Sequence, residues 1–232
     1  MELVDAMRSQ HACRAYRADP VPASVLYRAF EAARFGPQGG NRQPVRFLVV
    51  TDAAKRRQLA EWYLVPWKAY VEAALSDQHA IEAESGDAKA THVMAKDPER
   101  ALRAADQFAE HFADHPAVIV ALANLADTHP TDTDLGRLSI VGGASVYPIV
   151  QNLCLALRDQ GVATTLTTLL CMYEPQVKEL LGIPAELSTA AFIVAGYPAQ
   201  PFPTSLTRLP VEEIAFLDDL DHPLTAEAVG QT

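Results

Sequence analysis

The 232-residue chain has few cysteines and no long apolar run. Its three cysteines, Cys13, Cys154 and Cys171, form no C-x-x-C pair. An odd, unpaired set argues against a disulfide framework and favours a reducing compartment. No stretch of about 18 apolar residues occurs, so we expect no membrane-spanning helix. The first ten residues, M-E-L-V-D-A-M-R-S-Q, are acidic and polar rather than typical of a signal peptide, and we predict a cytoplasmic protein.

Positive charge is also scarce. Nineteen lysines and arginines stand against 29 aspartates and glutamates, which leaves a net charge of −10. Such a chain repels the phosphates of nucleic acids and of anionic membranes, so we expect neither as a partner. The sequence contains no G-x-G-x-x-G, no G-x-x-x-x-G-K-[ST] and no G-x-S-x-G. It therefore predicts no Rossmann dinucleotide-binding fingerprint, no phosphate-binding P-loop and no nucleophile elbow of an α/β hydrolase.

No group of side chains stands out as a catalytic or metal site. His111 and His115 lie four residues apart, a spacing that can hold a metal, but no third ligand is evident and a solvated helix face is the better interpretation. Cys13 lies near His11 and Arg14, which could lower the pKa of its thiol, yet no base accompanies it. We therefore predict no catalytic side chain and no metal. This absence is informative if a cofactor carries the chemistry.

The pattern of apolar residues predicts helices and strands in one domain. With 49% hydrophobic residues the chain has ample material for a core. Apolar periodicity predicts helices at 2–10, 24–34, 53–75, 99–115, 140–160 and 174–181, and buried strands at 45–50, 117–123, 162–169 and 190–196. Long crossovers between these elements predict a single α+β domain over residues 1–232.

Several local features refine this prediction. Pro66 is expected to break the helix that contains it, and Pro148 to bend its helix or mark the first turn. The helix at 140–160 is apolar over most of its girth, which favours a central helix or a subunit interface. Residues 76–98 lack a clear period and are interpreted as a polar excursion that could form a lid. Residues 200–232 are predicted to form an extended tail that crosses onto a partner subunit.

A glycine-rich loop precedes the first predicted strand. Residues 35–44 read F-G-P-Q-G-G-N-R-Q-P, in which glycine and proline create a bend that lets backbone approach a ligand. Asn41 and Gln43 carry amides that both donate and accept hydrogen bonds. This combination suits the pyrimidine edge of a flavin, where donors and acceptors alternate. Taken alone, the loop is more simply interpreted as an ordinary turn before a strand.

Two other segments also have two interpretations. Residues 10–17 read Q-H-A-C-R-A-Y-R and form either the start of an anion site or a solvated helix end that carries cations. The helix at 53–75 contains four aromatic residues that form either core or the wall of a substrate pocket, namely Trp62, Tyr63, Trp67 and Tyr70.

Four blocks of sequence resemble the FMN-dependent nitroreductase family over roughly residues 9–218. The first is H-A-C-R-A-Y at 11–16 with D-P-V-P at 19–22, and the second is G-P-Q-G-G-N-R-Q-P at 36–44. The third joins G-A-S at 143–145 and V-Q-N-L at 150–153 to G-V-A-T-T-L-T-T at 161–168. The fourth combines L-L-G-I-P at 180–184, G-Y-P at 196–198 and R-L-P-V-E-E at 208–213. Their order and spacing carry the resemblance.

The resemblance implies a fold and a cofactor. The fold is a three-layer α+β arrangement with a mixed sheet flanked by helices, in an intertwined homodimer with two FMN sites at the interface. The implied cofactor-binding residues are His11, Ala12 and Arg14 by the phosphate and ribityl chain; Gln38, Gly39, Asn41 and Gln43 from the partner's loop at the pyrimidine edge; Leu166, Thr167 and Thr168 along the ring; and Arg208 at the phosphate.

The resemblance also implies an activity. NAD(P)H would give hydride to FMN, and an electron-poor acceptor such as a nitroaromatic, a quinone or an enone would then take the electrons in a ping-pong mechanism. The chain departs from the usual family pattern at His11, where Arg is common, at Ala12, where Ser is common, and at Val45, where Trp is usual. The alternatives are another flavin reaction, such as dehalogenation or azoline oxidation, or a non-catalytic binding or stress protein that has lost FMN.

Overall fold

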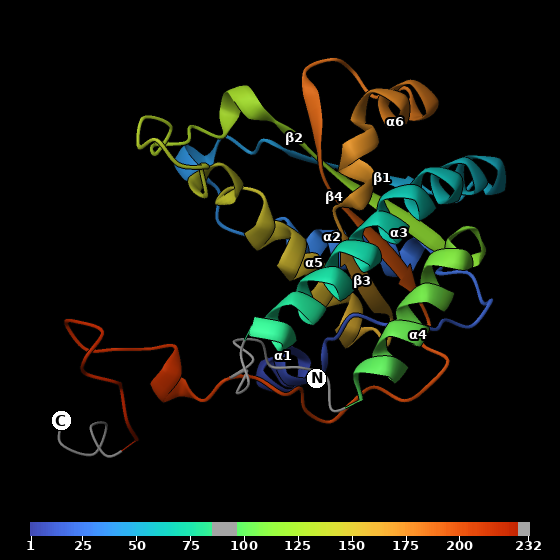
Figure 1. The fold of residues 1–232 in the computed structure, drawn as a ribbon. Helices are drawn as coiled ribbons and strands as arrows, with labels where there is room; N and C mark the ends of the chain where they lie inside the picture. Colours follow the sequence, from blue (N-terminus) through green and yellow to red (C-terminus); the bar gives the residue numbers. More distant parts are fainter. Residues whose placement is uncertain (85–96, 227–232) are drawn as a thin grey trace.

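The computed structural model describes residues 1–84 and 97–226 (Figure 1). Within these residues the chain forms helices α1 (Leu3–Ser9), α2 (Ala23–Ala33), α3 (Ala53–Glu84), α4 (Pro98–Glu110), α5 (Tyr147–Asp159) and α6 (Glu174–Leu181). The strands are β1 (Val45–Val50), β2 (Ala117–Asn124), β3 (Ala163–Thr167) and β4 (Leu187–Gly196). The α+β class predicted from the sequence is confirmed.

The four strands form one sheet in the order β1-β2-β4-β3. All three pairings between them are antiparallel. The sheet was expected to be mixed, and among the described residues parallel pairing is limited to an isolated bridge between Ala12 and Thr164. This bridge attaches residues 9–17, called the N-terminal segment below, to β3. Strands β1 and β3 form the two edges of the sheet.

Helices cover both faces of the sheet, so the molecule has three layers (Figure 1). Successive residues of a strand point to opposite faces. Ile119 and Ala121 of β2 therefore join a core with α2 and α5, while Val118 and Val120 join a second core with α3, α4 and α6. All four side chains are fully buried. Burial on both sides explains why β2 and β4 are continuous apolar runs in the sequence.

Helix α3 differs from its prediction. It continues through Pro66 without a break and extends to Glu84. A proline in a helix removes one backbone hydrogen bond, but Tyr63 in the preceding turn is 2% exposed and packs in the core, and this packing outweighs the local cost. Residues 76–84 are therefore helical, where the sequence showed no clear period. The rest of the predicted lid, at 85–96, lies outside the described residues.

The helix predicted at 140–160 begins only at Tyr147, because Pro148 occupies its first turn. The residues before it form a loop that is organised by the buried carboxylate of Asp132. This carboxylate accepts hydrogen bonds from Ser139 Oγ at 2.6 Å and from the backbone N–H of Ile140 at 3.0 Å. The donors lower the pKa of Asp132 to about 2. Ile140 is consequently held at the surface and does not form part of the predicted helix.

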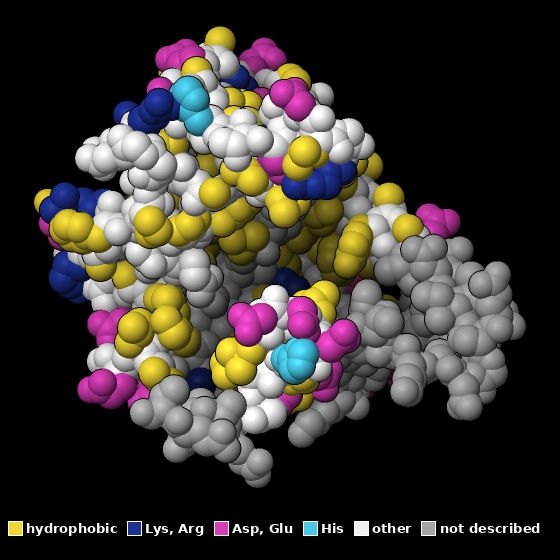
Figure 2. Space-filling model, turned by 90° about the vertical axis from the view of Figure 1, so that its left-hand side faces the viewer, with side chains coloured by type: hydrophobic (Ala, Val, Ile, Leu, Met, Phe, Trp, Pro, Cys, Tyr) yellow, Lys and Arg dark blue, Asp and Glu magenta, His cyan; other side chains and the backbone are white. Residues whose placement is uncertain are grey.

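After Phe202, whose ring contacts Arg158 of α5, the chain extends away from the helices (Figure 1). Five large apolar side chains along it are exposed: Leu209, Val211, Ile214, Leu217 and Leu220. Figure 2 looks onto the side from which this tail projects and shows hydrophobic side chains gathered around a hollow. Exposed apolar surface of this kind marks an interaction site.

Gly36 allows the glycine-rich loop to cross closely over α5. A Cβ atom at residue 36 would lie 2.7 Å from the Ile149 Cα atom, and a backbone atom cannot move aside cheaply. We expect Gly36→Ala to lower the free energy of unfolding by about 1–3 kcal/mol. Gly142→Ala is the control, because its added Cβ would have Ser139 Oγ as nearest neighbour at 3.7 Å. Urea denaturation of both variants measures the difference, and equal stabilities would contradict the close crossing.

Candidate functional site

The N-terminal segment lies directly along β3. The backbone N–H of Cys13 donates to the carbonyl of Thr164 at 3.1 Å, and Gln10 Nε2 donates to Thr164 Oγ1 at 3.2 Å. The Thr165 hydroxyl donates to the Cys13 carbonyl. The structure therefore places His11, Ala12 and Arg14 in a segment that runs along β3, and the end of this strand leads into the other predicted site residues, Leu166, Thr167 and Thr168.

Arg14 is a half-buried cation in this region. Its guanidinium carbon lies 5.3 Å from the centroid of the Phe108 ring on α4. Nearby, burial raises the pKa of Tyr63, while a hydrogen bond with Thr167 and the charge of Arg14 lower it. Leu166 and Thr168 are exposed, on either side of Thr167. The end of β3 thus presents an exposed edge beside a fixed positive charge.

His11 lies on the side of the segment that faces the tail. Its Nδ1 lies 3.4 Å from the Ser9 carbonyl, and its ring is edge-on to Phe202 at 6.0 Å between centroids. Arg158, in the last turn of α5, stacks over Phe202 at 3.7 Å and donates to Ser9 Oγ at 3.0 Å. Burial lowers the pKa of His11, as do Arg158 and Arg14. Positive charge here therefore comes from Arg14 and Arg158 rather than from His11.

Arg158 was missed in the sequence analysis. Its signal was weak, because a basic residue in the last turn of a helix is ordinary and favours the helix dipole.

Cys13 does not have the environment of a reactive thiol. It is 4% exposed, and its Sγ donates to the carbonyl of Ala15 at 3.2 Å. Burial raises the pKa of this thiol, and that effect exceeds the opposing one of Arg14. The idea that Cys13 has a lowered thiol pKa is therefore wrong, because burial outweighs the charge of Arg14.

The glycine-rich loop forms a second, separate part of the site. The backbone N–H of Gly39 donates to Ser145 Oγ at 3.0 Å, which ties the loop to the start of α5. Asn41 and Gln43 have φ angles of 52° and 53°. Left-handed backbone is strained at residues other than glycine, and such strain concentrates at functional sites. The two residues that carry these amides are exposed at the surface.

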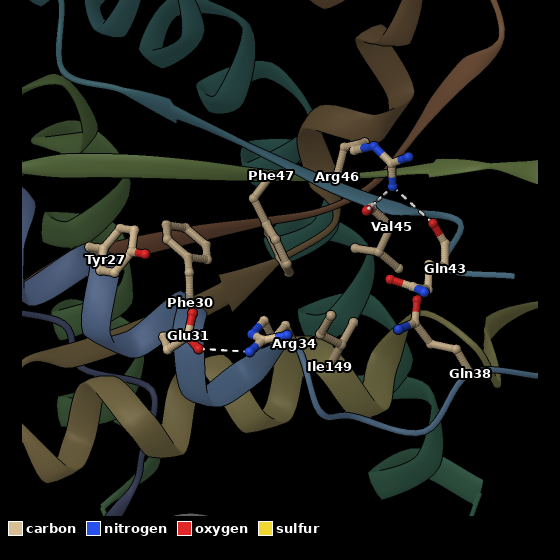
Figure 3. A pocket seen from close by; sticks show the side chains of 10 residues that line it. All are labelled: Tyr27, Phe30, Glu31, Arg34, Gln38, Gln43, Val45, Arg46, Phe47 and Ile149. Carbon is tan, nitrogen blue, oxygen red and sulfur yellow. Dashed lines mark hydrogen bonds and ion pairs between the residues drawn. The ribbon is translucent and has the colours of Figure 1, made fainter. Parts of the chain in front are cut away.

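Gln38 carries an unmet hydrogen-bonding group. Its Oε1 atom is buried and has no hydrogen-bond partner in the described part of the chain. A buried acceptor without a donor costs about 1–3 kcal/mol, so a bound group that offers an N–H would stabilise the loop. The amides of Gln38 and Gln43 line one end of a pocket of about 350 Å³, and the rings of Tyr27, Phe30 and Phe47 line the other (Figure 3).

The two parts of the site lie at opposite ends of α5. Ser145, which binds the glycine-rich loop, precedes the helix, and Arg158, which binds the N-terminal segment, lies in its last turn. A helix of 13 residues is about 20 Å long. One chain therefore does not bring Gln38, Gly39, Asn41 and Gln43 next to the residues of the N-terminal segment.

Arg208 also stands apart. It is exposed and donates to the carbonyl of its neighbour Thr207 at 2.7 Å. Within the described residues no hydrogen bond or ion pair joins it to His11 or Arg14.

The aromatic residues of α3 have different surroundings. Tyr63 is core, and Trp62 stacks on Tyr173 with 6.1 Å between the centroids. Trp67 Nε1 donates to the Asp106 carboxylate on α4 at 2.8 Å, and Tyr70 is 59% exposed. The core interpretation therefore applies to Tyr63 and Trp62, while Tyr70 remains a candidate for a pocket wall.

The histidines considered for a metal face different environments. His111 pairs with Asp114 at 3.0 Å on the surface, whereas His115 is 6% exposed and its Nε2 lies 3.2 Å from the carbonyl of Phe108. In the described residues no group of three or more His, Cys, Asp or Glu side chains is arranged to hold a metal ion.

Comparison with known proteins identifies the family. The nitroreductase family model matches residues 7–197, and the chain belongs to this family. A relative from Thermus thermophilus described as an NADH dehydrogenase is 29% identical over 217 residues, covering 90% of this chain and 92% of that protein.

Among the described residues, no helix is both long and apolar enough to span a membrane.

Solved structures share the fold at lower identity. An iodotyrosine deiodinase bound to FMN and 3-iodo-L-tyrosine has a TM-score of 0.62 at 21% identity, covering 90% of this chain and 96% of that one. The NADPH:FMN oxidoreductase of Vibrio harveyi, complexed with NAD⁺, has a TM-score of 0.62 at 17% identity, covering 98% of this chain and 81% of that one.

Proposed function

We propose that this chain is an FMN-dependent oxidoreductase that works as a homodimer. When bound, FMN would supply the redox chemistry, taking hydride from NAD(P)H and passing it in a ping-pong mechanism to an electron-poor acceptor such as a nitroaromatic, a quinone or an enone. The observation that carries this proposal is the position of Arg14: it follows Cys13, which is hydrogen-bonded to Thr164 of β3, and both Arg14 and Thr167 at the end of that strand lie near Tyr63, in a chain of the nitroreductase family. The deiodinase structure that shares the fold is bound to FMN, and the relative from Thermus thermophilus is described as an NADH dehydrogenase.

The residues present fit an FMN. Arg14 is a guanidinium donor suited to the phosphate dianion. Gln38 Oε1 is a buried acceptor that lacks a donor, as the pyrimidine edge of a flavin would provide. Leu166 and Thr168 are exposed at the end of β3, where a flat ring could lie against the backbone. No side chain is needed as the nucleophile, because FMN would carry the redox chemistry.

The proposed homodimer rests on features at the edge of the sheet. Strand β1 pairs with β2 on one side and is an edge strand of the sheet. An uncovered edge strand invites pairing with another chain. The pocket of Tyr27, Phe30 and Phe47 lies beside β1, and the extended tail carries exposed apolar side chains. We infer that the tail of a second copy covers this edge. The partner's glycine-rich loop would complete the flavin site that one chain leaves open at Arg14.

The visible spectrum of the purified protein tests this function. We expect flavin absorbance, either as isolated or after FMN is added, and bleaching when NADH or NADPH is added anaerobically. Re-oxidation by a nitroaromatic or a quinone would then follow. A protein that stays colourless after titration with FMN would refute the proposal and favour a binding protein without flavin. Bleaching without turnover of these acceptors would favour a different flavin reaction, such as dehalogenation.

A further inference from the structure

Arg14 belongs to a group of three side chains in contact. Its guanidinium lies over one face of the Phe108 ring at 5.3 Å. The His115 ring stacks on Phe108 with 4.7 Å between centroids and an angle of 22° between the planes. Phe108 therefore links the two, because its ring contacts both the guanidinium of Arg14 and the ring of His115.

The buried part of this group is rigid. Phe108 is 1% exposed and His115 is 6% exposed. The Nε2 atom of His115 lies 3.2 Å from the carbonyl of Phe108. Tyr16 packs edge-on against His115 at 5.0 Å, and its hydroxyl lies 2.9 Å from Thr165 Oγ1 on β3. The Phe108 ring is consequently fixed both to α4 and, through Tyr16, to the strand that carries Thr165.

Arg14 needs such a support. An arginine side chain has many rotamers, and fixing it for a ligand has an entropic cost unless it is already held. A guanidinium within about 6 Å of an aromatic ring is attracted to the face of that ring. Phe108 provides the face, and the rigid residues behind it prevent the ring from turning away.

The geometry points to Phe108 as a positioning residue for the flavin phosphate, acting through Arg14. This inference rests on the proposed function, because it assigns the phosphate of FMN to Arg14. Phe108 itself does not touch the cofactor. Its effect should therefore be limited to the part of FMN affinity that comes from the phosphate.

Riboflavin separates this effect from a general loss of structure, because it has the same ring as FMN and no phosphate. We would measure dissociation constants of both ligands by flavin fluorescence for the wild type, for Phe108→Leu and for Phe112→Leu. Phe112 is the matched control: it is fully buried in the same core, and its ring stacks on Tyr63 at 4.6 Å. A second pair, Phe108→Met and Phe112→Met, replaces the first if either Leu variant fails to fold.

We expect Phe108→Leu to weaken FMN binding by about 3–10-fold and to leave riboflavin binding within about twofold, as befits the loss of one cation–π contact. Phe112→Leu should leave the ratio of the two affinities unchanged. In an Arg14→Gln background, Phe108→Leu should have no further effect on FMN.

Three results would overturn the inference. Phe108→Leu could weaken FMN and riboflavin equally, Phe112→Leu could change the ratio as much as Phe108→Leu, or the two losses could add in the Arg14→Gln background. Failure of the proposed function looks different: the wild type itself would then bind neither FMN nor riboflavin.

Discussion

Arg14→Gln is expected to weaken FMN binding by about 10–100-fold, because a hydrogen bond between charged groups contributes about 1.5–3 kcal/mol. Arg14 is held over Phe108 beside the end of β3, whereas Arg208 forms its hydrogen bond with Thr207 in the tail. Glutamine keeps part of the length of the side chain and can still donate hydrogen bonds, but it has no charge. Titration of the apoprotein with FMN, followed by flavin fluorescence, measures the change.

Arg17→Gln provides the matched control for this experiment. Arg17 lies three residues from Arg14, but its Nε is 3.2 Å from the Asp19 carboxylate and its guanidinium lies over the Tyr197 ring at 5.2 Å. It is therefore engaged elsewhere, and we expect its loss to change FMN affinity by less than about threefold, as for a surface ion pair. If both variants weakened FMN equally, or if riboflavin binding fell as far as FMN binding in Arg14→Gln, the phosphate would not lie at Arg14.

The second large effect is on the pH dependence of stability. Burial lowers the pKa of His115 from 6.5 to about 4. Between these values the unfolded chain binds a proton on this histidine and the native chain does not. Stability is therefore fully present above pH 6.5 and falls as the pH drops to 4, by up to about 3 kcal/mol from this group. Urea denaturation of the apoprotein at pH 7, 5.5 and 4.5 measures the loss.

His115→Gln should remove this part of the dependence, because glutamine does not titrate and its amide can still donate to the Phe108 carbonyl. His111→Gln is the control, since His111 is an exposed residue that directly follows α4 and pairs with Asp114. We predict that the decline in stability from pH 7 to pH 4.5 becomes shallower only in His115→Gln. A decline of the same size in all three proteins would show that His115 is not buried as a neutral ring.

Much of the fold could be predicted because its signals are local. Residues 174–181 were predicted as a helix, and α6 has these bounds. The alternation of apolar side chains in β1 and the apolar runs of β2 and β4 likewise indicated the strands. Pro66 misled the prediction because the packing of α3 on the core cannot be deduced from the neighbouring sequence. Ile140 did so because its position depends on Asp132, eight residues earlier.

The site was predictable only in part, for a similar reason. Residues 11–16 and 161–168 both carry the family resemblance, and they do lie side by side. The first segment runs along β3, which the second segment contains. The contact of Phe108 with Arg14, and that of His115 with Phe108, were missed. Each of the two is an ordinary residue near a helix end until the fold brings them together. The distance between Gln38 and Arg14 is also invisible in the sequence. It depends on the length of α5 between two loops.

The central claim is that each flavin site takes Arg14 from one chain and the glycine-rich loop from another. Co-expression of Arg14→Gln and Gln38→Glu chains with different tags, followed by two affinity steps, isolates the mixed dimer. One of its two sites would then carry both changes and the other neither. We predict that the mixed dimer binds one FMN with wild-type affinity, while each homodimer of variant chains binds FMN weakly at both sites. A mixed dimer that binds FMN as weakly as the homodimers would contradict a site shared between subunits.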